Sequence, residues 1–314
     1  MAAPLELRLG LSPRPITRAL VDGTVQPEGV RLICVEDFGR GQRNAGTARH
    51  RAIVSGALDG GEFSMSSLFL ARQRGIGLVA LPIFLARGYC HRSMYRHASA
   101  PIRTPSDLRG KRVTVHRYNN TVAVWMRALL AGDYGVSAHE IQWYVAEDDL
   151  EGEPAPTGVP LFRVPQPAGP QQVVEMLASG QLDAALEAYL RPGPGIRRII
   201  EDFRDVEAAY YRRTRVLPIF HTLVLQADLL EQHGWLARSL LDAFRAARGL
   251  APGYSSDAER AEAFWEEAVL DDDPYAHHLG SCERRTLDEL ARLLLNEGLL
   301  ARPLSPETLF ACAG

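Results

Sequence analysis

The sequence predicts an α/β protein of two lobes, joined by two chain crossings into a hinged clamp. Short apolar segments alternate with amphipathic helical stretches, which is typical of a mostly parallel sheet. A polar, proline-bearing stretch at 97–107 separates one set of these units from a second, and the apolar segment 216–225 brings the chain back. We therefore expect lobe 1 to comprise residues 1–100 and 218–314, and lobe 2 to comprise residues 101–217.

The elements of lobe 1 follow one another in strand–helix order. Strand-length apolar segments alternate with stretches of helical periodicity, and after the return crossing only helical periodicity remains. The expected strands are 6–11, 30–35 and 76–82, the expected helices are 16–22, 48–57, 236–248, 257–270 and 284–297, and residues 62–67 join a further strand to a helix.

Lobe 2 shows the same alternation, from Asp107 onward. A Pro/Gly-rich loop at 146–170 interrupts it, and this loop is longer than ordinary connections between elements, so it is either a functional flap or a disordered insertion. The expected strands are 112–116, 141–145 and 182–188, and the expected helices are 121–130 and 171–178.

Composition excludes several classes of function. The formal net charge of -3 provides no basic stripe for nucleic acid, and no apolar run approaches the length of a membrane span, so we expect neither partner. The N-terminal residues lack the pattern of a secretory signal, and this favours a cytoplasmic protein. The oligomeric state stays open, a homo-oligomer included.

Cysteine and lysine usage limits the chemistry further. The four cysteines, Cys34, Cys90, Cys282 and Cys312, show no CxxC spacing, so a disulfide framework or a structural zinc site is not expected. Lys111 is the single lysine, which leaves one candidate for Schiff-base chemistry. No GxxxxG precedes it, so no phosphate-binding P-loop is present.

Two apolar segments each deliver a proton carrier to the predicted cleft. LPIFLARGYCHRSMY brings Arg87 and His91 together, and VLPIFHTLVL carries His221 where the chain returns to lobe 1. Arginine binds anions and histidine exchanges protons near neutral pH, so this combination suits an anionic small molecule. A satisfied structural histidine is the alternative for His91 and for His221.

Further candidates lie at strand ends and helix starts, where ligands of open α/β sheets bind. Arg18 follows the first strand, Ser64 and Ser67 lie between a strand and a helix, and Asn120 and Thr121 open the helix TVAVWMRALL. Exposed amides and the helix dipole at such a start favour a carboxylate. A surface charge is the alternative for Arg18.

These segments together resemble the 4,5-dihydroxyphthalate decarboxylase family, whose enzymes use the periplasmic-binding-protein type II fold. The resemblance extends over nearly the whole chain, although no single piece is diagnostic. The matching pieces are TRAL with VDGTVQPEGVRL, EFSMSS, LPIFLARGYCHRSMY, DLRGKRVTV followed by RYNNTVAVW, GQLDAALEA, EAAYYRRTRVLPIFHT and NEGLLARPLSPETLF.

The resemblance implies decarboxylation of a dihydroxylated aromatic carboxylate such as 4,5-dihydroxyphthalate to protocatechuate, without a cofactor. A hydroxyl para to the departing carboxylate lets the ring take a proton and act as the electron sink. His91 would be the proton donor, and His221 would bind or deprotonate a ring hydroxyl. Arg87 and Arg18 would hold the carboxylates. Ser64, Ser67, Asn120 and Thr121 would orient the ring substituents.

Three segments depart from the family pattern. The family's loop after the first strand has the form Tyr-Asp-Arg-Thr-Arg, whereas SPRPITRAL keeps only the Thr-Arg. The segment ahead of the helix of lobe 2 reads HRYNNT, and LEAYLRPGPG replaces a more polar stretch. A related enzyme acting on a different aromatic acid is therefore an alternative, and so is a solute-binding protein for a small aromatic anion.

One cluster invites a metal ion. His277 and His278 follow Asp271, Asp272 and Asp273, but adjacent side chains do not face one site, so we expect neither a metal nor a cofactor. The acidic run is expected to be a solvated loop.

Overall fold

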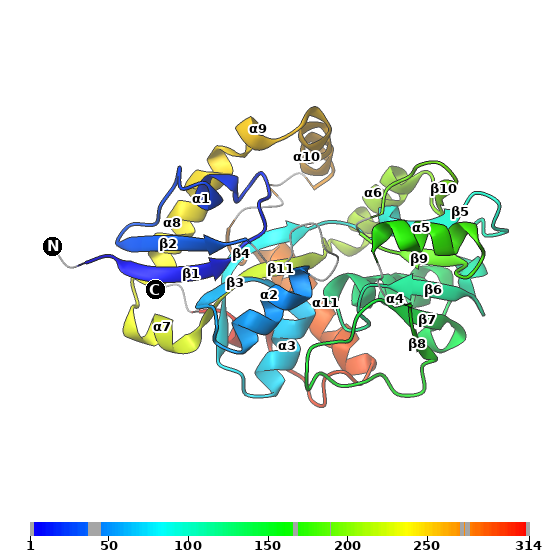
Figure 1. The fold of residues 1–314 in the computed structure, drawn as a ribbon, viewed down its shortest axis with the longest axis horizontal. Coiled ribbons are helices and arrows are strands. Elements are labelled where there is room, and N and C mark those ends of the chain that lie inside the picture. The colour runs from blue at the N-terminus through cyan, green and yellow to red at the C-terminus, as the bar shows by residue number, and fades with distance from the viewer. Residues whose placement is uncertain are drawn as a thin grey trace. The chain divides into compact units, whose positions relative to one another are not determined.

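The computed structural model describes residues 3–36, 45–165, 169–188, 190–270, 273 and 277–311. The chain folds into two compact units, each with its own sheet (Figure 1). Unit 1 comprises Met1–Arg87, Ile219–Asp288 and Leu304–Gly314, and unit 2 comprises Gly88–Pro218 and Glu289–Pro303.

The unit boundaries differ from the predicted lobes at Pro218, which belongs to unit 2, and over two longer segments. Residues 88–100 belong to unit 2, because strand β5 (Met94–His97) pairs with strands of the second sheet. Residues 289–303 also belong to unit 2, since helix α11 (Ser281–Asn296) passes from one unit to the other after Asp288. The chain therefore has two crossings beyond the predicted pair, at 288/289 and at 303/304.

The sheet of unit 1 has the strand order β2-β1-β3-β11-β4. β1 runs parallel to β2 and β3, whereas β11 is inserted antiparallel between β3 and β4. Its inner positions are leucines and isoleucines that pack against α1 and α8, and this packing removes apolar surface from water. The strands are β1 (Leu5–Gly10), β2 (Val30–Val35), β3 (Gly60–Ser64), β4 (Leu78–Arg87) and β11 (Ile219–Gln226).

Helices surround this sheet in the order that the sequence predicts. The first helix is shorter than expected. It begins at Arg18, because prolines precede it, and it ends at Val21. Gly23 follows shortly after, with a φ of 82° that is unfavourable for other residues. The helices of unit 1 are α1 (Arg18–Val21), α2 (Ala45–Val54), α3 (Met65–Gln73), α7 (Ala227–Gln232), α8 (Leu236–Gly249), α9 (Ala251–Tyr254), α10 (Asp257–Leu270) and the first half of α11.

The sheet of unit 2 has the order β10-β5-β9-β6-β7-β8. β6 runs parallel to β7 and β9, and β5 lies antiparallel between β9 and β10. The strands are β5, β6 (Arg112–Val115), β7 (Gln142–Val145), β8 (Leu161–Arg163), β9 (Ala184–Leu186) and β10 (Ile196–Arg198), and the helices are α4 (Thr121–Tyr134), α5 (Pro170–Ala178) and α6 (Phe203–Thr214).

The predicted flap contains regular structure. Within 146–170, β8 extends the sheet by pairing in parallel with β7. The preceding turn is bonded to the segment before α4: the backbone N–H of Asn119 donates to Asp149, and its side-chain amide donates to the carbonyl of Pro154. Residues 166–168 lie outside the described part of the chain.

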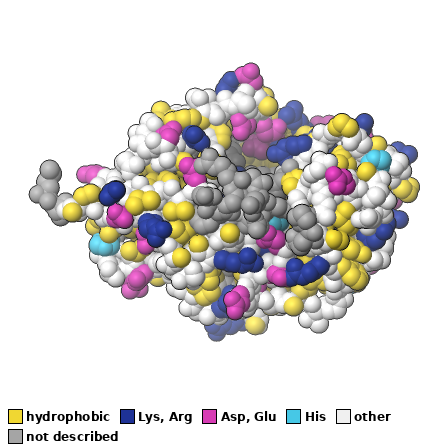
Figure 2. Space-filling view, in the orientation of Figure 1, with side chains coloured by type: hydrophobic (Ala, Val, Ile, Leu, Met, Phe, Trp, Pro, Cys, Tyr) yellow, Lys and Arg dark blue, Asp and Glu magenta, His cyan; other side chains and the backbone are white. Residues whose placement is uncertain are grey.

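Charge is distributed without a large patch of one sign on the face shown in Figure 2, where arginines and carboxylates are interspersed. In the described residues, no helix is both long and apolar enough to cross a membrane.

Candidate functional site

The central feature of unit 1 is a buried carboxylate, Glu62, on β3. The two residues before it on the strand are glycines because the backbones approach closely: a Cβ on Gly61, where φ is 146°, would meet the carbonyl oxygen of Gly10 at 2.4 Å. Glu62 is only 1% exposed. Burial of an unpaired carboxylate costs several kcal/mol, so its partners decide whether it is tolerated.

His221 is one of these partners. Its Nδ1 lies 2.5 Å from Oε1 of Glu62, and its side chain retains 18% of its exposure. β11 is irregular at this point, with register shifts against β4 on either side of His221 and Thr222. The Thr222 hydroxyl donates to the carbonyls of Leu81 and Ile83. Irregular strand positions of this kind re-aim side chains near active sites.

Two arginines complete the surroundings of Glu62. Arg14 Nη2 lies 2.5 Å from the same oxygen that His221 contacts, and the Arg14 side chain is 36% exposed. Arg49 is buried on α2, with Nη2 3.5 Å from the other carboxylate oxygen. The backbone N–H of Ser12 also donates to that oxygen, at 3.2 Å. Glu62 thus has partners from three segments that lie far apart in the sequence.

The charge states follow from this arrangement. Burial alone would raise the pKa of Glu62, but Arg14, Arg49 and the hydrogen bond from His221 outweigh it and hold the pKa well below its usual value. Burial, aided by the two arginines, lowers the pKa of His221, and Glu62 opposes this. An ionised carboxylate can only accept a hydrogen bond, so neutral His221 carries its proton on Nδ1. The lone pair is then on Nε2, which makes His221 a base.

A serine-rich helix start lies beside this pair. Ser64, the residue before α3, pairs with His221 across β3 and β11, and its hydroxyl lies 3.2 Å from that of Ser66. The buried hydroxyl of Ser67 has no hydrogen-bond partner among the described residues. Of the two predicted serines, Ser64 therefore lies beside His221.

The other predicted arginines of unit 1 are placed differently. Arg87 ends β4, and its Nη1 lies 2.6 Å from Oε1 of Glu283 in a buried ion pair, so its charge is compensated within the unit. Arg18 is half-buried and begins α1, and its charge helps to lower the pKa of Asp22.

His91 lies in unit 2, in the short 3₁₀ turn before β5. It is 1% exposed, and its ring packs edge-on against Tyr210 with the centroids 5.2 Å apart. Neither ring nitrogen has a hydrogen-bond partner among the described residues. Burial lowers the pKa of His91 to about 4, so His91 is neutral at pH 7.

Asn120 and Thr121 stand at the start of α4, as predicted. The side-chain oxygen of Asn120 accepts a hydrogen bond from the backbone N–H of Ala123 at 2.8 Å, which is a helix cap. Thr121 is buried. The Asn120 oxygen is therefore already engaged in stabilising the helix.

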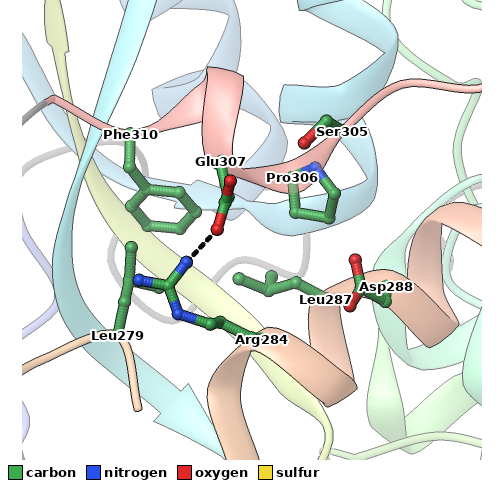
Figure 3. A pocket seen from close by; sticks show the side chains of 8 residues that line it. All are labelled: Leu279, Arg284, Leu287, Asp288, Ser305, Pro306, Glu307 and Phe310. Atoms are coloured by element: carbon green, nitrogen blue, oxygen red, sulfur yellow. Dashed lines mark hydrogen bonds and ion pairs between the residues drawn. The ribbon is translucent and has the colours of Figure 1, made fainter. Parts of the chain in front are cut away.

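A separate surface pocket lies beside the C-terminal segment, and none of the site residues predicted from the sequence lines it. An ion pair between Arg284 and Glu307 spans it, and Phe310 and Leu287 form apolar walls (Figure 3). The charges of Arg284 and Glu307 are therefore paired, and Asp288 and Ser305 are the other polar residues that line the pocket.

The described residues hold no group of three histidine, cysteine or acidic side chains that could bind a metal ion. His277 is buried, and this burial lowers its pKa to about 4. His278 is exposed. Asp271 and Asp272 of the same predicted cluster lie outside the described residues.

Sequence reasoning missed Arg14 and Arg49. Arg14 is 48 residues from Glu62 along the chain, and His221 is 159 residues from it. Hydrophobic periodicity reports only on neighbouring residues, so it cannot reveal contacts over such separations. The one available signal is Glu62 itself, since an acid between glycine and phenylalanine in a buried strand requires a cation or a proton donor nearby.

No family model matches the chain. The chain is 31% identical over 265 residues to the 4,5-dihydroxyphthalate decarboxylase of Comamonas testosteroni, covering 81% of this chain and 78% of that protein. It is 29% identical over 207 residues to the enzyme of the same name from Pseudomonas putida, covering 62% and 77%.

Among solved structures, the alkanesulfonate-binding protein SsuA from Xanthomonas axonopodis pv. citri, bound to MOPS, superposes with a TM-score of 0.61 at 15% identity over 99% of both chains. This likeness confirms the predicted α/β fold of the periplasmic-binding-protein type II class. The sequence relationship confirms the predicted resemblance: the chain belongs to the 4,5-dihydroxyphthalate decarboxylase family.

Proposed function

We propose that this protein decarboxylates a dihydroxylated aromatic carboxylate such as 4,5-dihydroxyphthalate, giving protocatechuate and carbon dioxide. The observation that carries the proposal is the contact of 2.5 Å between Glu62 and His221 in a member of this family. A carboxylate that orients a neutral imidazole makes that imidazole a base near neutral pH.

The reaction needs a base because the ring itself must become the electron sink. His221 Nε2 takes the proton of a ring hydroxyl, and the resulting phenolate pushes electron density to the para carbon, which bears the carboxylate. That carbon accepts a proton, the bond between it and the carboxylate carbon breaks, and carbon dioxide leaves as the ring becomes aromatic again. The proton on His221 then returns to the oxygen, so the net change is one proton consumed per carbon dioxide released.

The charge around His221 suits an anionic substrate. Two arginines, Arg14 and Arg49, lie within 3.5 Å of the single carboxylate of Glu62. Arg14 is the more exposed of the two arginines and is the side chain that a substrate carboxylate could reach. The unpartnered Ser67 hydroxyl could donate to a ring substituent.

The role of His91 as the group that donates the proton to the ring carbon stays a prediction. In the absence of substrate His91 is neutral, so this role requires a bound anion to raise its pKa. Carboxylate binding by Arg87 also stays a prediction, and it would require Arg87 to share its charge with Glu283.

The proposal is tested by incubating the purified protein with 4,5-dihydroxyphthalate in D₂O. We expect carbon dioxide and protocatechuate in equal amounts, with one deuterium on the carbon that lost the carboxylate. Unlabelled product, or no product under any condition that leaves the protein folded, would contradict the proposal.

The fold supports a second candidate function, capture of a small aromatic anion without turnover, because alkanesulfonate-binding proteins share it. The departures from the family pattern in SPRPITRAL support a related enzyme with a different aromatic acid as substrate. Thermal stabilisation by 4,5-dihydroxyphthalate without product would favour capture. Turnover of another hydroxylated benzoate alone would favour the related enzyme.

A further inference from the structure

Arg49 is the most deeply buried charged partner of Glu62. It is 6% exposed, and its guanidinium makes three contacts. Nε donates to the backbone carbonyl of Glu62 at 3.1 Å, Nη1 donates to the Ser12 hydroxyl at 2.8 Å, and Nη2 lies 3.5 Å from the Glu62 carboxylate. Arg49 thus touches both the backbone and the side chain of Glu62.

The fold makes room for this side chain. A Cβ on Gly10 would meet Cγ and Cδ of Arg49 at 2.8 and 2.9 Å, so the stem of Arg49 passes directly over the end of β1. Burying an arginine is costly unless its charge is compensated and its N–H groups are bonded. An arginine on the surface would not carry this desolvation cost. The burial of Arg49 therefore indicates that its charge is needed beside Glu62.

We propose that Arg49 is a positioning residue: it fixes the Glu62 carboxylate beside His221, and its charge helps to keep the imidazole of His221 neutral. This inference rests on the proposed function for its catalytic meaning. The effect of Arg49 on the pKa of His221 can be measured without any turnover.

The charged and titratable groups facing His221 come from three segments. Glu62 lies on β3, Arg14 lies in the loop after β1, and α2 contributes Arg49 and His50, whose ring is edge-on to His221 at 5.7 Å. Removal of the Arg49 charge leaves Arg14 and His221 to keep Glu62 ionised. His221 then loses one repulsive cation, so its protonated form becomes less unfavourable and its pKa rises.

The test is an NMR titration of the protein labelled with isotopically enriched histidine. The nine histidine signals are reduced by one in His221→Asn, which identifies the resonance of His221. We expect the pKa of His221 to rise in Arg49→Gln and to stay near the original value in Arg49→Lys, which keeps the charge. Arg31→Gln, a change of an exposed arginine of β2, is the matched control and should leave it unchanged.

Gly10→Ala supplies a second variant if Arg49→Gln does not fold, because the added methyl group displaces the Arg49 stem while its charge is retained. We expect a smaller rise of the same sign. An unchanged His221 pKa in a folded Arg49→Gln or Gly10→Ala protein would overturn the inference. Absence of decarboxylation by the unaltered protein would instead contradict the proposed function alone, since the titration reads Arg49 independently of turnover.

Discussion

Glu62 and His221 lie on adjacent antiparallel strands, and Oε1 of the carboxylate is 2.5 Å from Nδ1 of the imidazole. The pair depends on the irregular register of β11, which Thr222 stabilises by donating to two carbonyls of β4.

Replacement of Glu62 by glutamine should lower kcat with little change in KM. The amide retains the shape but not the charge, so the imidazolium formed during turnover is no longer stabilised and its orientation is lost. We expect a loss of about 10²-fold, within the range typical of acid–base groups. Steady-state kinetics on Glu62→Gln check this, with an exposed acid such as Glu267→Gln as the control. Equal activity of Glu62→Gln and the unaltered protein would refute the role.

Turnover should depend on pH through His221. The base must be neutral, and burial lowers the pKa of His221 below its usual value. The value of kcat/KM should therefore rise with pH through a midpoint below about 6.5 and level off above it. A profile of kcat/KM from pH 4.5 to 8 tests this. Activity that falls steadily over this range would show that the protonated form of the histidine is required instead.

His91 should destabilise the folded protein in acid. Its pKa is about 4 when folded and about 6.5 in an unfolded chain, so the unfolded chain binds more protons between these values and stability falls as the pH falls through them. From pH 7 to pH 5 the loss is about 2 kcal/mol for one such group. Urea unfolding at the two pH values should show this loss reduced in His91→Phe and retained in His139→Gln, an exposed control. Identical pH dependence in His91→Phe would contradict the buried, neutral state.

The ion pair between Arg127 and Glu297 should be needed for the stability of unit 2. Arg127 is buried on α4, and Glu297 accepts from its Nε at 2.9 Å just after α11. Glu297→Ala leaves the guanidinium uncompensated, and we expect a loss of about 3 kcal/mol. The double variant Arg127→Met with Glu297→Ala should regain part of the stability that Glu297→Ala loses. Thermal unfolding measures both, and additive losses in the double variant would contradict coupling of the two side chains.

The sequence predicts the fold well where apolar periodicity is strong. The strand at 30–35 has the predicted bounds, and α8, predicted at 236–248, ends one residue later, at Gly249. Helix α6 escaped prediction because only Glu207 and Tyr211 are buried along it, and its position depends on an ion pair from Arg92. Such a helix has no apolar stripe to detect.

The sequence predicts which types of residue form the site better than it predicts which of them contact one another. The sequence predicts His221 from its place in an apolar strand, whereas Glu62 is recognisable only as an acid within a buried strand. The contact between them crosses two strands, and the arginines that set its charge come from a loop and a helix. Only tertiary pairing brings these residues together, and the local pattern around Arg14 or Arg49 carries no sign of it.

The most direct test of the account compares carbon dioxide release from 4,5-dihydroxyphthalate by the unaltered protein and by His221→Asn at pH 7, with His278→Asn, a change of an exposed histidine in the same unit, as the control. We predict release by the unaltered protein and by His278→Asn, and a loss of at least roughly 10²-fold in a folded His221→Asn protein. Equal release by all three proteins would contradict the central claim that His221, oriented by Glu62, is the base of this reaction.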